Sequence, residues 1–149
     1  MSLLQDVQNT GAADFGRPLF VVSLALFAKD GKVLLCRRPE GKNLAGMWEF
    51  PGGKVEKGET PSQALVREIT EELSLTLAEN NLIPASFACT KDIIMLLYFC
   101  KDWEGTVIPT EKQETSWILP EHFKDFPMPE ADILLCRQVW YNDYVGSSE

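Results

Sequence analysis

The sequence predicts one α+β domain in which helices pack on a mixed β-sheet, and three observations indicate this fold class. The chain has 149 residues, of which 45% are hydrophobic and 24% are charged, a balance typical of one globular domain. Short runs of β-forming residues alternate with turn signals along much of the chain. Two longer segments instead carry apolar residues at helical spacing.

The N-terminal third is expected to hold a hairpin after a short tail. Residues 1–18 show no clear period and predict a flexible tail, so that the domain spans residues 19–149. Residues 19–27 are rich in β-formers, and the step Asp30-Gly31 predicts a tight turn into a second strand over 33–38. A loop rich in glycine and proline then leads to the segment Trp48–Gly53.

The clearest helix is expected to begin at Thr60-Pro61, because threonine is a good N-cap and proline suits the first helical position. It should run to about Leu73. The remaining expected elements are strands over 84–90, 93–100 and 116–119, a looser strand or loop over 103–109, and a last helix over 130–144.

Charge and composition exclude several classes of function. The net charge of −8, from 22 acidic and 14 basic residues, disfavours binding to a nucleic-acid polymer. No apolar run reaches the ~18 residues of a membrane-spanning helix. We expect a cytoplasmic protein without a membrane partner, a monomer or weak dimer that binds a small molecule.

The cysteine and histidine content limits the available chemistry. The four cysteines are widely spaced and predict small buried side chains in a reducing compartment: Cys36, Cys89, Cys100 and Cys136. The only histidine, His122, is expected to be exposed. The sequence therefore gives almost no support for a histidine-based metal site or catalytic triad.

An acidic cluster on the first helix indicates a metal site. Glu68, Glu71 and Glu72 share one helical arc, where like charges repel. A solvated acidic face would be the better explanation if they stood alone. The preceding glycines, Gly52 and Gly53, let backbone carbonyls approach a ligand closely. Ligation by oxygen alone suits Mg²⁺ or Mn²⁺.

From Gly53 the sequence reads G-x5-E-x7-R-E-U-x-E-E-x-S-U, where U is a bulky aliphatic residue. It resembles the Nudix box, with Ser74 in the place of a glycine. A serine is tolerated at this helix end if the backbone avoids the left-handed conformation. The flanking segment Trp48–Lys54 resembles the MutT branch of the family, and a looser resemblance covers residues 19–139. The resemblance implies a Nudix fold, a mixed sheet sandwiched between helices.

The resemblance also implies site residues. Glu68, Glu71 and Glu72 would bind or act around divalent metals with the Gly52 carbonyl, and Glu111 would be a further metal-binding or base glutamate. The general base is either Glu68 or Glu111. The residues implied for support and phosphate binding are the ion pair Glu59–Arg67, and Arg38 and Lys54, respectively.

The nucleobase would be bound near the start of the last helix. The resemblance places Glu130 or Asp132 in hydrogen-bonding contact with the base. A carboxylate accepts hydrogen bonds from a cytosine amino group or from the N–H edge of an oxidised guanine. Asp132 could instead be a helix N-cap. Phe50 is a candidate for stacking on the base, or a core residue.

The function implied is that of a Mg²⁺-dependent nucleoside triphosphate pyrophosphohydrolase of the MutT type. It would convert 8-oxo-dGTP to the monophosphate and pyrophosphate, which sanitises the nucleotide pool. CTP or a modified dCTP is the alternative substrate, and a nucleoside-diphosphate sugar a further one. A non-catalytic nucleotide-binding module and a plain acidic interaction domain are the alternatives from other classes.

Overall fold

The computed structural model describes residues 17–141. Its strands and α-helices are, in chain order, β1 (Leu19–Leu26), β2 (Val33–Arg37), β3 (Trp48–Glu49), β4 (Gly52–Lys54), α2 (Pro61–Leu73), β5 (Ile83–Cys89), β6 (Ile93–Cys100), β7 (Thr115–Ile118) and α3 (Glu130–Cys136). Short 3-10 helices cover Glu79–Asn81 and Pro120–Asp125, and a π-helical turn, Arg137–Tyr141, continues α3. Most of the expected tail and the end of the expected last helix lie outside the described residues.

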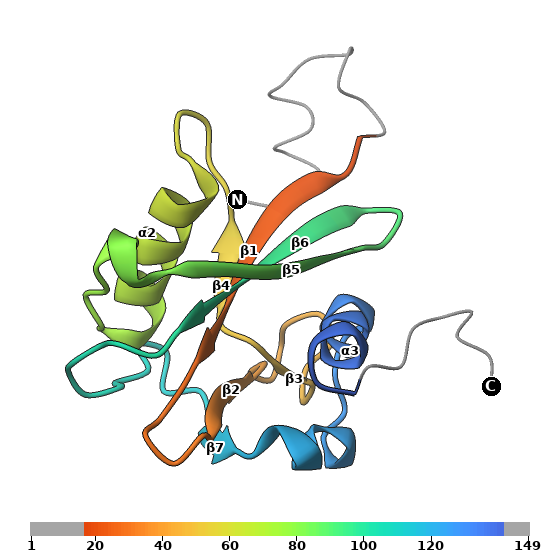
Figure 1. Ribbon diagram of the computed structural model, residues 1–149. Coiled ribbons are helices and arrows are strands. Elements are labelled where there is room, and N and C mark those ends of the chain that lie inside the picture. The colour runs from red at the N-terminus through yellow and green to blue at the C-terminus, as the bar shows by residue number, and fades with distance from the viewer. Residues whose placement is uncertain (1–16, 142–149) are drawn as a thin grey trace.

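The strands form two sheets (Figure 1). The larger one is mixed and has the order β4-β1-β6-β5, in which β1 runs parallel to β6 and antiparallel to β4. The smaller one is antiparallel, with β2 between β3 and β7. The single mixed sheet expected from the sequence is therefore divided into two.

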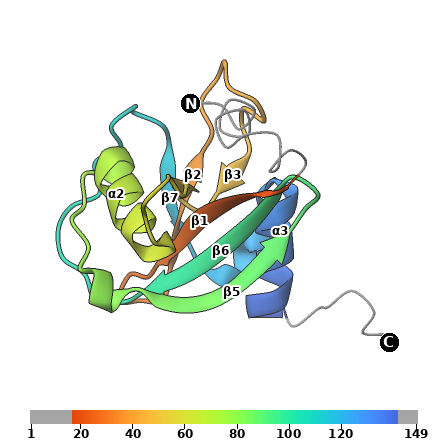
Figure 2. The same ribbon diagram turned by 90° about the horizontal axis from the view of Figure 1, so that it is seen from above.

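The helices α2 and α3 lie on opposite sides of the larger sheet, which both views show (Figures 1 and 2). Alternate residues of β1 explain this arrangement. Val22 and Leu24 belong to the hydrophobic cluster that includes α2, whereas Ala25 belongs to the cluster that includes α3. Because both faces are covered, β1 is buried from Val22 to Leu26. The α+β sandwich expected from the sequence is confirmed.

Helix α2 has the expected start. The Thr60 side chain accepts a hydrogen bond from the Gln63 backbone N–H, and the Gln63 side chain accepts one from the Thr60 N–H. This reciprocal pair satisfies two backbone donors that the helix leaves unbonded.

The end of α2 differs from the expectation. Ser74 has φ 61° and ψ 29°, so it does adopt the left-handed conformation. Its N–H donates to the Thr70 carbonyl, and its hydroxyl donates to the Ile108 carbonyl at 3.1 Å. These bonds hold the serine in a conformation that glycine adopts more easily.

Other expectations also need correction. The short strands β3 and β4 were not expected, and within the described part of the chain residues 103–109 form no strand. The last α-helix ends at Cys136 before the π-helical turn. Cys36, Cys100 and Cys136 are buried, but Cys89 is exposed at the end of β5. None of the helices described is long and apolar enough to cross a membrane.

Candidate active site

A cleft of about 420 Å³ lies between the larger sheet and the start of α3. Its lining comes from the strands β1, β3, β4 and β6, the loop after β2, the end of α2, the β5–β6 turn and residues 129–132. Six residues predicted for the site line it: Arg38, Phe50, Gly52, Glu72, Glu130 and Asp132. The others lie outside this lining: Lys54, Glu59, Arg67, Glu68, Glu71 and Glu111.

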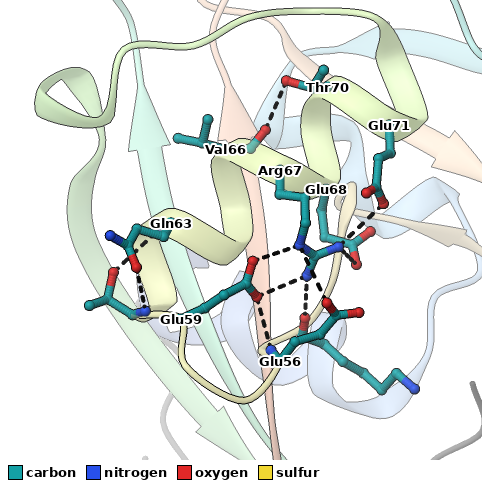
Figure 3. A network of polar contacts seen from close by, with 10 residues as sticks. Glu56, Glu59, Gln63, Val66, Arg67, Glu68, Thr70 and Glu71 are labelled. Carbon is teal, nitrogen blue, oxygen red and sulfur yellow. Dashed lines mark hydrogen bonds and ion pairs between the residues drawn. The ribbon is translucent and has the colours of Figure 1, made fainter.

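Arg67 organises the carboxylates beside this cleft (Figure 3). Its Nε and Nη2 donate to the two oxygens of Glu59 at 2.6 and 3.0 Å. Its Nη1 donates to Glu68 at 3.1 Å and to Glu71 at 3.2 Å. Nη2 also donates to the Lys54 carbonyl at 3.1 Å, so the guanidinium ties the glycine-rich strand to α2. These bonds raise the pKa of Arg67 and lower that of Glu59.

The glycines of β4 make room for the Glu68 carboxylate and for the neighbouring strand β1. A Cβ at Gly53 would collide with the Glu68 carboxylate, and one at Gly52 would collide with the Val22 carbonyl oxygen. The Gly52 N–H donates to Glu72 Oε1 at 3.3 Å. The absence of a side chain at Gly53 therefore lets α2 bring Glu68 against the strand, and its absence at Gly52 lets β4 lie close to β1.

Negative charge accumulates around Glu72. Burial, then the neighbouring carboxylate of Glu68, raises its pKa to about 8, with further contributions from Glu49 and Glu111. Burial also raises the pKa of Glu68, although its bonds to Arg67 oppose this. Two partly buried carboxylates that resist ionisation create a site where a cation would be favourable.

The donor set fits a hard divalent cation by its chemistry. Carboxylate and carbonyl oxygens are the ligands preferred by Mg²⁺. These oxygens do not form a closed coordination shell, because no three Asp, Glu, His or Cys side chains in residues 17–141 are grouped to hold a metal ion. Glu71 forms an ion pair with Arg67, and Glu111 forms one with Lys42 at 3.5 Å. Both glutamates are exposed, so they can turn toward a cation without disturbing the core.

Asp132 lines the same cleft from α3 and is only 1% exposed. One oxygen, Oδ2, accepts a hydrogen bond from the Phe50 N–H at 3.1 Å. The other, Oδ1, is buried without a hydrogen-bond partner. Burial raises the pKa of Asp132 to about 7. Pro129 is the N-cap of α3, so the alternative that Asp132 caps this helix is wrong.

The Phe50 ring lies in the core. Phe50 is 4% exposed, and its ring packs against Phe123 and Trp140 with centroids 5.8 Å away. Phe50 contributes to the polar part of the cleft through its backbone N–H, which donates a hydrogen bond to Asp132. Glu130 is exposed on the cleft rim.

Comparison with known proteins decides the family. A model of the NUDIX domain matches residues 17–138. The chain belongs to the Nudix family. A CTP pyrophosphohydrolase of Escherichia coli is 38% identical over 116 residues, 76% of this chain and 86% of that protein. An 8-oxo-dGTP diphosphatase of Haemophilus influenzae is 38% identical over 110 residues, 70% of this chain and 79% of that protein.

Solved structures agree with this Nudix assignment. A MutT structure from work on Aliivibrio salmonicida and Vibrio cholerae superposes with a TM-score of 0.74 at 28% identity, covering 85% of this chain and 99% of that one. The E. coli ORF135 protein gives 0.65 at 36% identity, covering 80% and 86%. The protein is a MutT-type Nudix hydrolase, an enzyme for phosphoanhydride bonds of small nucleotides. Nudix hydrolases generally use divalent metal ions.

One residue of this Nudix site was missed from the sequence. Glu49 lines the cleft, and its charge raises the pKa of both Glu72 and Asp132. Burial raises the pKa of Glu49 itself. Arg38, predicted to bind phosphate, donates to Glu49 at 3.2 Å and to the Asn43 carbonyl at 2.7 Å. In the sequence Glu49 stands between Trp48 and Phe50, so the segment has the pattern of an apolar strand. The contact of Glu49 with Arg38 depends on the pairing of β3 with β2, which the sequence does not indicate.

Proposed function

We propose that this Nudix hydrolase cleaves 8-oxo-dGTP to the monophosphate and pyrophosphate and thereby sanitises the nucleotide pool. The observation that carries the proposal is that one cleft is lined both by the box residues Gly52 and Glu72 and by Asp132, whose buried carboxyl has one oxygen without a hydrogen-bond partner. A triphosphate at one end and a base at the other would fill such a cleft. Relatives named 8-oxo-dGTP diphosphatase support this choice of substrate.

Mg²⁺, or Mn²⁺ in its place, would be held by Glu68, Glu71, Glu72 and Glu111 with the Gly52 carbonyl. When bound, the ion supplies neutralisation of phosphate charge and a more acidic water. Glu68 or Glu111 would accept the proton of the attacking water. Glu68 is already fixed by Arg67 and lies against Gly53 of β4, whereas Glu111 must first leave Lys42.

The protein's cations would stabilise the phosphate chain. Arg38 lines the cleft and Lys54 follows the paired glycines. We propose that both approach phosphate oxygens, as the Nudix resemblance implies. The ion pair of Arg67 with Glu59 would keep the loop and helix in register during this contact.

Asp132 would read the base through Oδ1, since Oδ2 is engaged by Phe50. In its ionised form Oδ1 would accept a hydrogen bond from an N–H group of the oxidised guanine. Glu130, on the rim, would be a second polar contact. Phe50 would act through its backbone, which fixes the carboxyl.

CTP or a modified dCTP is the second candidate substrate. It is favoured by the similarity to a CTP pyrophosphohydrolase, and by Asp132, because a cytosine amino group also donates to a carboxylate. The same cleft and the same hydrolytic residues would serve either substrate.

A chromatographic turnover panel with Mg²⁺ tests the choice. It compares 8-oxo-dGTP, dGTP, CTP, 5-methyl-dCTP, ADP-ribose and diadenosine tetraphosphate by kcat/KM. We expect 8-oxo-dGTP to be preferred over dGTP by at least about tenfold, which corresponds to ~1.4 kcal/mol. A preference for a cytidine nucleotide would replace the substrate and leave the hydrolytic site unchanged.

We further propose a cytoplasmic enzyme that works as a monomer or weak dimer, without a nucleic-acid polymer or membrane as partner. The four cysteines are free, which fits a reducing compartment. The net charge of −8 opposes binding to DNA or RNA.

A further inference from the structure

The loop between β2 and β3 places an exposed leucine on the rim of the cleft. Leu44 is 46% exposed and has φ 59°, a left-handed conformation that is uncommon for leucine. Six large hydrophobic residues are exposed in the part of the chain that the structure describes, and of these only Leu44 lines the cleft.

This leucine is held in place although it is exposed. The Arg38 side chain donates to the carbonyl of Asn43, the residue before Leu44, at 2.7 Å. The Arg38 N–H donates to the Met47 carbonyl at 2.8 Å, and the Gly46 N–H donates back to the Arg38 carbonyl at 3.0 Å. Arg38 itself is fixed by its ion pair with Glu49. The loop therefore presents Leu44 from a backbone anchored on both sides.

The Phe50 ring is packed in the core, so it does not offer a free aromatic face to a base bound in the cleft. Pro129 and Ala131 line the cleft at the start of α3, and Ile93 and Met95 line it from β6. Leu44 belongs to the same lining and is contributed by a separate loop. A planar base bound in this cleft would remove apolar surface of Leu44 from water.

We propose that Leu44 is a specificity-determining residue, whose side chain packs on the nucleoside part of the substrate. The inference rests on the proposed function and adds a residue to it that the Nudix box does not contain. Its contribution is to binding of the nucleoside, and it makes no contact with the reacting phosphate.

Two variants separate the side chain from the backbone. Leu44→Asn removes the apolar surface, and asparagine tolerates the left-handed conformation. Leu44→Met keeps an apolar side chain of similar volume. Ile83→Thr is the control, since Ile83 is 55% exposed on β5, outside the cleft.

The measurement is KM and kcat for the preferred nucleoside triphosphate, with the inhibition constant of inorganic pyrophosphate as a probe that lacks a base. For Leu44→Asn we expect KM to rise about fivefold, as loss of partial apolar burial predicts. The kcat and the pyrophosphate constant should stay unchanged, and Leu44→Met and Ile83→Thr should resemble the wild type. An unchanged KM in Leu44→Asn, or an equal change in the pyrophosphate constant, would overturn the inference.

Failure of the proposed function gives a different result. If the wild type cleaves no nucleotide, binding of 8-oxo-dGMP and CMP is measured by calorimetry in the same variants. A Kd that rises about fivefold in Leu44→Asn would keep the role of Leu44 while the proposed reaction fails. Absence of binding to the wild type would overturn both.

Discussion

Glu72 illustrates how this fold uses an unfavourable charge. Its carboxyl lies against the Gly52 N–H, and burial and neighbouring glutamates raise its pKa to about 8. A folded-state pKa above the ordinary value means that ionisation of Glu72 opposes folding at neutral pH. Such a position is unfavourable for stability alone and useful for holding a cation.

The variant Glu72→Gln is expected to separate activity from stability. It keeps the shape but removes the charge, so kcat with Mg²⁺ should fall by about 10²-fold or more. The metal-free protein should be at least as stable as the wild type in thermal unfolding, because it no longer contains a carboxyl whose ionisation opposes folding. Glu121→Gln, on an exposed carboxylate with 74% of its side chain accessible, is the matched control and should change neither quantity. Normal turnover in Glu72→Gln would contradict the role assigned to this residue.

Asp132 predicts a pH dependence of stability. Its pKa is raised from 3.8 to about 7 by burial. The neutral carboxyl therefore favours folding fully below pH about 4, and this contribution is lost as pH rises through 7. Asp132→Asn keeps an acceptor for the Phe50 N–H but cannot ionise.

The two proteins should therefore be similarly stable at pH 4, whereas Asp132→Asn should be the more stable one at pH 8, by on the order of 2 kcal/mol. Urea unfolding of the metal-free proteins at a series of pH values measures this difference. A difference that stays constant from pH 4 to pH 8 would show that Asp132 does not have the raised pKa.

At the scale of elements, the end of α2 stores a small strain. Ser74 is left-handed, and its hydroxyl and N–H are both bonded. Ser74→Gly should relieve the strain, whereas Ser74→Ala keeps it and loses the hydroxyl bond. We expect Ser74→Gly to be more stable than Ser74→Ala by about 1 kcal/mol in urea unfolding. Equal stability of the two variants would contradict the left-handed conformation.

The elements differ in how well the sequence predicts them. Helix α2 carries its own cap and apolar arc, so its bounds were predicted correctly. The strands β3 and β4 are only two and three residues long, too short for a period to appear. β3 pairs with β2 and β4 pairs with β1, and these contacts form only in the folded chain. The change from α to π geometry after Cys136 has no local signal that we recognise.

At the scale of the whole molecule, the site joins segments that are distant in the chain. The bond between the Phe50 N–H and Asp132 spans 82 residues. The spacing of the box could indicate Glu68, Glu71 and Glu72 as neighbours on one helix face. It could not indicate that Glu111 pairs with Lys42, or that Arg38 is engaged by Glu49. The catalytic roles of these residues stay predictions.

Product analysis of 8-oxo-dGTP incubated with the wild-type protein, with and without Mg²⁺, is the decisive experiment for the proposed reaction. We predict Mg²⁺-dependent formation of the monophosphate and pyrophosphate in equal amounts, and loss of both in Glu72→Gln. Release of inorganic phosphate in place of pyrophosphate, or no cleavage with either Mg²⁺ or Mn²⁺, would contradict the proposed reaction.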